Sequence, residues 1–145
     1  MAKKAVQKKA RPSVAAKTTA RNPLLAKVRG AEHRYIGHVR LDIGQAGAAR
    51  VKRMIYPPGF HWAVDMKPVT GTELCMHGHV GFLAQGQITI KYADGCVVKH
   101  KAPQIVCIDP GHDGWVVGSE PVVLIEFDFE RKTLKKLGLP KTHQH

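Results

Sequence analysis

The sequence has few cysteines, few aromatic residues and no long apolar segment. Only three of its 145 residues are cysteine, Cys75, Cys96 and Cys107, an odd number at wide spacing. Such a set fits neither a disulfide framework nor a Cys-x-x-Cys zinc site, so we expect free thiols in a reducing compartment. No run of about 18 apolar residues exists, and the start of the chain lacks the apolar segment of a secretory signal. These absences predict a cytoplasmic protein without a membrane partner.

Acidic residues are missing from the first part of the chain. Residues 1–30 hold nine Lys and Arg and no Asp or Glu, whereas the rest of the chain holds fourteen basic and eleven acidic side chains. Low hydrophobicity combined with charge of one sign buries too little surface to offset the entropy of ordering. We therefore expect a disordered basic tail over residues 1–30, one domain over residues 31–133 and a flexible tail over residues 134–145. The N-terminal tail predicts at most weak, non-specific binding to nucleic acid.

The pattern from Arg34 onward predicts an all-β fold. Short runs rich in Val, Ile, Phe and Tyr alternate with turn residues, and Ala93-Asp94-Gly95 is a good hairpin turn because Gly readily adopts positive φ. This rhythm is typical of a sandwich or barrel. The expected strands cover residues 34–43, 49–55, 61–67, 78–84, 87–92, 96–101, 104–108, 114–117 and 121–129.

The segment around Cys75, His77 and His79 is the richest in potential ligands. If this segment is extended, its side chains alternate between faces, and these three share one face. Two imidazoles and a thiol in one cavity can ligate zinc, iron, nickel or copper. The same His-x-His pair also fits a structural role, with one histidine hydrogen-bonded inside the barrel and the other at its mouth. The spacing alone leaves both interpretations open.

Three longer segments carry a resemblance to a known family. They are Trp62–Thr72, Cys75–Gly86 with its Cys-x-x-x-His-Val-Gly-Phe pattern, and Pro110–Pro121 with the run Pro-Gly-His-Asp-x-Trp-Val-Val-Gly-x-Glu-Pro. On these segments the chain from about residue 41 to 130 resembles the cupin superfamily, in particular small single-domain bacterial cupins of uncharacterised function. The resemblance implies a cupin-type double-stranded β-helix, a jelly-roll barrel around a small-molecule pocket.

The sequence departs from the general cupin motifs at the metal-binding positions. His79 stands where the first motif usually has its glutamate, and Cys75 falls near that motif's second histidine. Trp115 occupies the place of the histidine in the second motif, and His112 is offset from it by three residues. The usual set of three histidines and one glutamate is therefore not preserved. The resemblance leaves four candidate ligands for one divalent transition metal: Cys75, His77, His79 and His112.

A pocket without metal is the alternative. In that case Trp62, Phe82 and Trp115 bury an apolar ligand, while His79 and His112 fix its polar end. The candidate ligand pocket is thus formed by Trp62, Phe82, His112 and Trp115.

Three functions follow from these patterns. The first is a binding or sensory module for an unknown small molecule, with or without a metal, which dimerises through strand 34–43. The second is a metal-dependent isomerase, hydrolase or dioxygenase acting on a small oxygen-containing substrate. The third is a nucleic-acid-associated protein that binds through residues 1–30. No paired carboxylates are expected in the pocket, which lowers the weight of the enzyme hypothesis.

Overall fold

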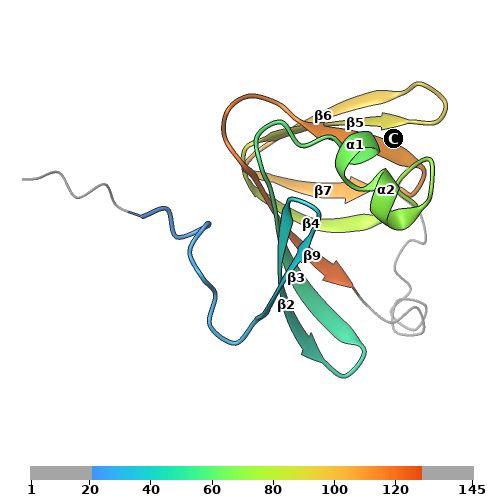
Figure 1. Cartoon of the computed structure of the whole chain (residues 1–145). Coiled ribbons are helices and arrows are strands. Elements are labelled where there is room, and N and C mark those ends of the chain that lie inside the picture. The colour runs from blue at the N-terminus through green and yellow to red at the C-terminus, as the bar shows by residue number, and fades with distance from the viewer. Residues whose placement is uncertain (1–20, 129–145) are drawn as a thin grey trace, which may run out of the picture.

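The computed structural model describes residues 21–128, which form nine strands and two short helices (Figure 1). In chain order these are β1 (Glu32–Ile36), β2 (Val39–Ala46), β3 (Ala49–Tyr56), α1 (Trp62–Asp65), α2 (Lys67–Thr70), β4 (His79–Gln85), β5 (Gln87–Tyr92), β6 (Val97–Lys101), β7 (Gln104–Ile108), β8 (His112–Val116) and β9 (Val122–Asp128). The expected tails over residues 1–20 and 134–145 lie outside the described residues.

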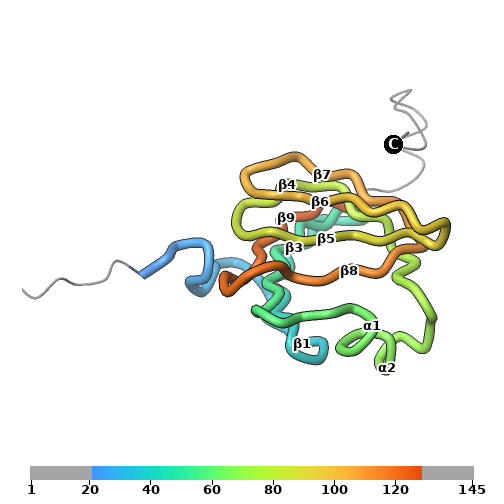
Figure 2. Tube along the Cα trace, turned by 90° about the horizontal axis from the view of Figure 1, so that it is seen from above, coloured from blue at the N-terminus to red at the C-terminus, as the bar shows by residue number. Residues whose placement is uncertain are grey.

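The strands form two antiparallel sheets. The larger sheet has the order β1-β2-β3-β9-β4-β7, and the smaller has the order β6-β5-β8. Consecutive strands change sheet between β4 and β5 and between β6 and β7, so the chain winds around one interior (Figure 2). The expected all-β fold is confirmed. The hairpin turn at Ala93-Asp94-Gly95 is also confirmed, because it joins β5 to β6 with Gly95 at a φ of 90°.

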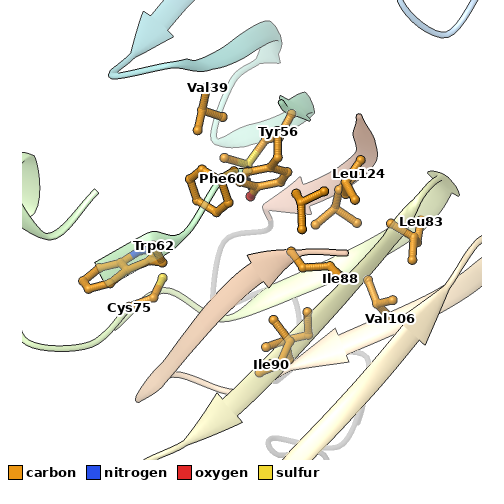
Figure 3. Packing of buried hydrophobic residues seen from close by; sticks show 14 of the residues in the cluster. Val39, Tyr56, Phe60, Trp62, Cys75, Leu83, Ile88, Ile90, Val106 and Leu124 are labelled. Carbon is orange, nitrogen blue, oxygen red and sulfur yellow. Dashed lines mark hydrogen bonds between the residues drawn. The ribbon is translucent and has the colours of Figure 1, made fainter. Parts of the chain in front are cut away.

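The core lies between the inner faces of the two sheets (Figure 3). Leu83, Val106 and Leu124 of the larger sheet are at most 2% exposed, and they belong to one cluster with Ile88 and Ile90 of β5. Burial of each such aliphatic side chain stabilises the fold by about 1.5–3 kcal/mol. The apolar side chains on the inner face of each strand therefore hold the two sheets together.

Strand β4 lies unusually close to β9. Gly81 is paired with Glu126 in the register of these strands, and a Cβ atom added at Gly81 would lie 2.0 Å from the backbone oxygen of Ile125. Only glycine permits this approach. The inward face of β4 alternates through His79, Gly81 and Leu83. The close pairing brings His79 of β4 within reach of Glu126 of β9.

The strand expected over residues 34–43 is wrong, because this segment is a hairpin. β1 ends at Ile36 and β2 begins at Val39, with Gly37 at a φ of 55° in the turn. The alternation of apolar and polar residues continues across this turn, so the sequence pattern does not show that one strand ends and another begins. β1 is the edge strand of the larger sheet. The homodimer expected through this part of the chain stays a prediction.

The strand expected over residues 61–67 is also wrong. The segment forms α1 and α2 instead; α1 lies beside β8, and α2 packs next to α1 (Figure 2). The Asp65 carboxylate accepts a hydrogen bond from the backbone N–H of His61, and Pro68 stands in the first turn of α2, where the missing N–H costs nothing. Among the described residues, no helix is long and apolar enough to span a membrane.

Part of the expected N-terminal tail contacts the barrel. Arg53 donates hydrogen bonds to the carbonyl oxygens of Leu24 (2.8 Å) and Ala26 (2.6 Å), and Arg40 donates to that of Leu25 (3.1 Å). Both guanidinium groups also pair with the buried carboxylate of Asp42. Residues 24–26 are thus held against the barrel, and the limits expected for the tail and the domain stay a prediction.

Candidate functional site

A cavity of about 340 Å³ opens between the two sheets. Most of its wall is aliphatic or aromatic, and its polar groups gather on a few strands. The lining residues are Ile36, Leu41, Arg50, Lys52, Met54, Tyr56, Phe60, Trp62, Met66, Thr70, Cys75, His77, His79, Ile88, Ile90, Ile108, His112, Gly114 and Leu124.

Three buried donors converge at one place on this wall: Cys75, His79 and His112. One ligand atom of each lies within 4.8 Å of the other two. His79 is the first residue of β4 and His112 the first of β8. Cys75 is held by backbone pairing with β8, because its N–H donates to the carbonyl oxygen of His112 (2.7 Å) and its own oxygen accepts from Gly111 (2.7 Å). The fold therefore brings one donor from each of three segments to the same point.

His79 lies between the Cys75 thiol and a buried carboxylate. Its Nε2 is 3.6 Å from Sγ of Cys75, and its Nδ1 hydrogen-bonds Oε1 of Glu126, which is 1% exposed. Burial lowers the pKa of His79, but the hydrogen bonds to Cys75 and Glu126 outweigh burial and raise the pKa to about 9. Burial raises the pKa of Glu126, but His79 and then Lys52 lower it to about 2. At neutral pH the pair is therefore an imidazolium and a carboxylate.

The Cys75 thiol is flanked by two imidazoles. Burial raises its pKa, but hydrogen bonds with His112 and His79 outweigh burial and lower the pKa to about 6. His112 is oriented in turn, because its Nδ1 donates to the carbonyl oxygen of Asp109 (2.5 Å). This bond leaves Nε2 of His112 as the nitrogen that interacts with the Cys75 thiol or with a ligand. Cys75 is therefore a thiolate at neutral pH.

His77 lies at the edge of this group. Its Nε2 accepts a hydrogen bond from Nζ of Lys52 (3.0 Å) and lies 3.6 Å from Oδ1 of Asp128. Lys52 also pairs with Glu126 (3.0 Å) and Asp128 (3.3 Å). His77, His79 and Glu126 form a second set of donor atoms within 4.8 Å of one another. All four metal ligands suggested by the resemblance thus line the cavity, but His77 is grouped with Glu126 rather than with Cys75.

Two of the four residues expected in the ligand pocket do not line it. Trp62 and His112 do, but Phe82 lies on the outer face of β4, where it is 38% exposed. Trp115 lies on the outer face of β8, where its ring contacts that of His61 at 5.6 Å. The reason is the alternation of side chains along a strand, since each aromatic residue is an odd number of positions from the inward histidine of its strand.

The sequence-based search missed Glu126. The residue lies inside an apolar run and shares the inward face of β9 with Val122 and Leu124. A charged side chain at an inward position is rare unless it is paired. The inward position of Glu126 within an apolar strand was therefore the sequence feature that could have identified it. Glu126 contacts His79 and Asp128 lies 3.6 Å from His77, but neither carboxylate is among the residues that line the cavity, so the expectation of no paired carboxylates in the pocket stays a prediction.

The fold is shared with proteins of known structure. No family model matches the sequence, and no curated protein is significantly similar to it. A Cupin 2 conserved barrel domain protein from Salinispora arenicola CNS-205 matches with a TM-score of 0.50 at 13% identity, over 79% of this chain and 94% of that chain. An RmlC-like cupin from Shewanella frigidimarina NCIMB 400 matches with a TM-score of 0.49 at 15% identity, over 75% and 93%. The cupin domain of Schizosaccharomyces pombe Cnp3 matches with a TM-score of 0.47 at 14% identity, over 73% and 71%.

The first of these matches, together with the two sheets wound around one cavity, shows that the chain has the cupin fold. At this identity the likeness concerns the fold alone. The function has to be argued from the cavity and its side chains.

Proposed function

We propose that the chain is a small-molecule-binding barrel whose cavity holds one transition-metal ion on Cys75, His79 and His112. One observation carries this proposal: the two imidazoles each have one nitrogen occupied by an acceptor outside the cluster. Nδ1 of His79 is bound to Glu126, and Nδ1 of His112 is bound to the carbonyl oxygen of Asp109. Metal-ligating histidines almost always donate their second N–H to a carboxylate or a backbone carbonyl, so both imidazoles are oriented as ligands.

The donor set fits a borderline metal better than a hard one. A thiolate and two imidazoles are typical ligands of zinc, whereas magnesium and calcium prefer oxygen. Three protein ligands leave a coordination position for a small molecule, as in zinc sites that bind substrate or water. The ion would supply Lewis acidity toward an oxygen or sulfur atom of the bound molecule. The thiolate at Cys75 is already favoured by its two imidazole neighbours.

The remaining polar residues support the ligands. Glu126 accepts from His79 on one oxygen and pairs with Lys52 on the other, so it fixes the orientation of the imidazole. Lys52 in turn contacts His77 at the exposed edge of the cluster. This network is also the observation that favours the second candidate, a metal-dependent enzyme, because it places a histidine and a lysine beside the centre as possible proton carriers.

Metal stoichiometry tests the proposal. Full-length protein without a tag is stripped with a chelator and titrated with zinc against a competing indicator, with His143 and His145 replaced by alanine in every sample. We expect about one ion per chain, and at least a 100-fold loss of affinity in Cys75→Ser and in His79→Ala. His38→Ala is the matched control, because this imidazole is 81% exposed and lies outside both donor sets. Cobalt substitution gives a second readout, a thiolate-to-cobalt charge-transfer band that Cys75→Ser removes.

Zinc binding that is unchanged in Cys75→Ser and His79→Ala contradicts the metal centre. In that case the cavity remains a binding site for an organic molecule, and the imidazoles serve as its polar anchors.

A further inference from the structure

The wall of the cavity away from the proposed metal-binding donors is mainly apolar, and its other polar residues are Arg50, Lys52, Thr70 and Tyr56. Aliphatic residues come from both sheets, and three aromatic residues, Tyr56, Phe60 and Trp62, stand close together on it. The rings of Tyr56 and Phe60 are in contact, with centroids 4.8 Å apart, and Trp62 lies near Cys75 (Figure 3). An apolar ligand binds favourably to such a surface because water is excluded from both. Burying a charged group against the same surface is unfavourable.

The cations that line the cavity are already neutralised. Arg50 pairs with Asp128 (2.8 Å), and Lys52 pairs with both Asp128 and Glu126. These two cations and two carboxylates balance one another. The part of the cavity that the structure describes therefore offers no unpaired cation to a phosphate or carboxylate ligand.

One buried hydroxyl has only a weak partner. Tyr56 is 6% exposed, and among the described residues the hydrogen-bond acceptor of its O–H is the thioether sulfur of Met54 (3.4 Å). A thioether is a poor acceptor. Burial and the nearby negative charges of Glu126 and Cys75 raise the pKa of Tyr56 well above its usual value, so the hydroxyl keeps its proton. Tyr56 is thus a donor that lines the cavity and lacks a strong acceptor.

We infer that the ligand is an uncharged, mainly apolar molecule with a single oxygen acceptor, such as a ketone, that accepts the hydrogen bond of Tyr56. The inference rests on the binding cavity of the proposed function and deepens it by naming the ligand class. It does not depend on the metal, because Tyr56, Phe60 and Trp62 are not among the candidate metal ligands. In the metal-free cavity, nucleotides, sugar phosphates and fatty acids are disfavoured by the same argument, since each brings a negative charge and the cations that line the described part of the cavity are already paired.

Three probes with the same ring and different substituents test the inference. They are naphthalene, 2-acetylnaphthalene and 2-naphthoate, whose binding is measured by calorimetry on zinc-loaded and on chelator-treated full-length protein. The ketone is expected to bind more tightly than the hydrocarbon by about two- to tenfold, the net effect of one hydrogen bond. On the chelator-treated protein the carboxylate is expected to bind at least tenfold more weakly than the ketone, because it must be desolvated without a partner. On the zinc-loaded protein the open coordination position would itself attract a carboxylate, so that form does not test this comparison.

The variant Tyr56→Phe separates the hydrogen bond from the shape of the cavity. We expect it to remove the preference for the ketone over naphthalene and to leave the affinity for naphthalene unchanged within twofold. Tyr35→Phe is the matched control, because Tyr35 is 71% exposed on β1. Circular dichroism checks that both variants fold.

The outcomes distinguish this inference from the proposed metal centre. If the ketone preference and its loss in Tyr56→Phe appear in both the loaded and the stripped protein, the inference stands even where zinc binding fails. If 2-naphthoate binds best to the chelator-treated protein, or if none of the three probes binds to either form, the inference is wrong, whether or not the protein can hold zinc.

Discussion

The carboxylate of Glu126 on β9 accepts a hydrogen bond from the imidazole of His79 on β4, and neither side chain is exposed to solvent by more than a tenth. The bond leaves the second nitrogen of His79 facing the Cys75 thiol. The proposed metal ligand His79 is therefore oriented from behind by a neighbouring strand, and the orientation depends on the close approach of β4 and β9 at Gly81.

Replacement of Glu126 tests this orientation. Glu126→Gln keeps the shape and one acceptor but removes the charge that favours the His79 N–H donor, so we expect zinc affinity to fall about tenfold; Glu126→Ala removes the acceptor, and about 100-fold is expected. Zinc competition against an indicator measures both. Glu73→Gln is the control, because Glu73 forms an exposed pair with Lys67. Equal zinc affinity in all three variants contradicts a positioning role for Glu126.

The sequence predicted the strands better than it predicted the site. Alternation of apolar residues with frequent turns identified seven of the nine strands at nearly their observed limits, since period-two patterning follows directly from which face is buried. It failed at Gly37, where the pattern continues across a turn, and at residues 61–67, where Pro68 and the contacts of Asp65 select helices. Both errors concern the conformation of the backbone, a turn in one case and helices in the other. The pattern of apolar residues does not specify either.

The candidate ligands were identified, but their partners were not. Cys75, His79 and His112 were recognisable as donors by residue type, whereas the acceptors that orient the two histidines were not. Glu126 is 47 positions from His79, and the acceptor for His112 is the backbone oxygen of Asp109. The first contact depends on the pairing of β4 with β9 within the larger sheet and the second on the turn before β8, and the pattern of apolar residues predicts neither. The odd spacing that placed Phe82 and Trp115 on outer faces was, in contrast, readable once the strand limits were known.

Cys75 is expected to be the reactive cysteine of the metal-free protein. Its pKa of about 6 means that the thiolate predominates at neutral pH, and the cavity gives a small reagent access to it. Chelator-treated protein is alkylated with iodoacetamide and the modified peptides are quantified by mass spectrometry. We expect the rate at Cys75 to rise between pH 5 and 7 with a midpoint near 6, and zinc to suppress it at least tenfold. Cys96, which is exposed, is the internal control. Absence of zinc protection at Cys75 argues against its role as a ligand.

Acid is expected to destabilise the metal-free protein through Glu126. The folded-state pKa is about 2 and the ordinary value is 4.5, so the unfolded chain binds the proton first. The stabilisation is complete above about pH 4.5 and is lost as the pH falls from there toward 2. A shift of this size corresponds to a few kcal/mol in the free energy of unfolding.

Urea unfolding of the chelator-treated protein between pH 2.5 and 6 measures this effect. Glu126→Gln cannot lose a charge at this position, so its stability is expected to vary less with pH by a few kcal/mol across the same window. Parallel curves for the parent and the variant show that the carboxylate does not carry the acid sensitivity.

Arg53 is expected to hold the segment before β1 against the barrel. Its guanidinium pairs with the buried carboxylate of Asp42 and donates to the carbonyl oxygens of Leu24 and Ala26, and the side chain is 10% exposed. Arg53→Met keeps the apolar stem and removes these bonds, which leaves Asp42 with fewer partners. Breaking a buried ion pair by removing one member costs about 3 kcal/mol, so we expect a loss of this size in urea unfolding.

The same variant should release residues 24–26, which makes tryptic cleavage after Lys27 and Arg29 faster. Arg34→Met is the matched control, because the pair of Arg34 with Glu32 is exposed on both sides and an exposed pair contributes less than about 1 kcal/mol. If Arg53→Met loses stability while cleavage at Lys27 and Arg29 stays at the parent rate, the Asp42 pair stabilises the sheet alone and the segment is held by other contacts. If the free energy of unfolding and the cleavage rate both stay at their parent values, the attraction within the buried pair is cancelled by the cost of desolvating its charges.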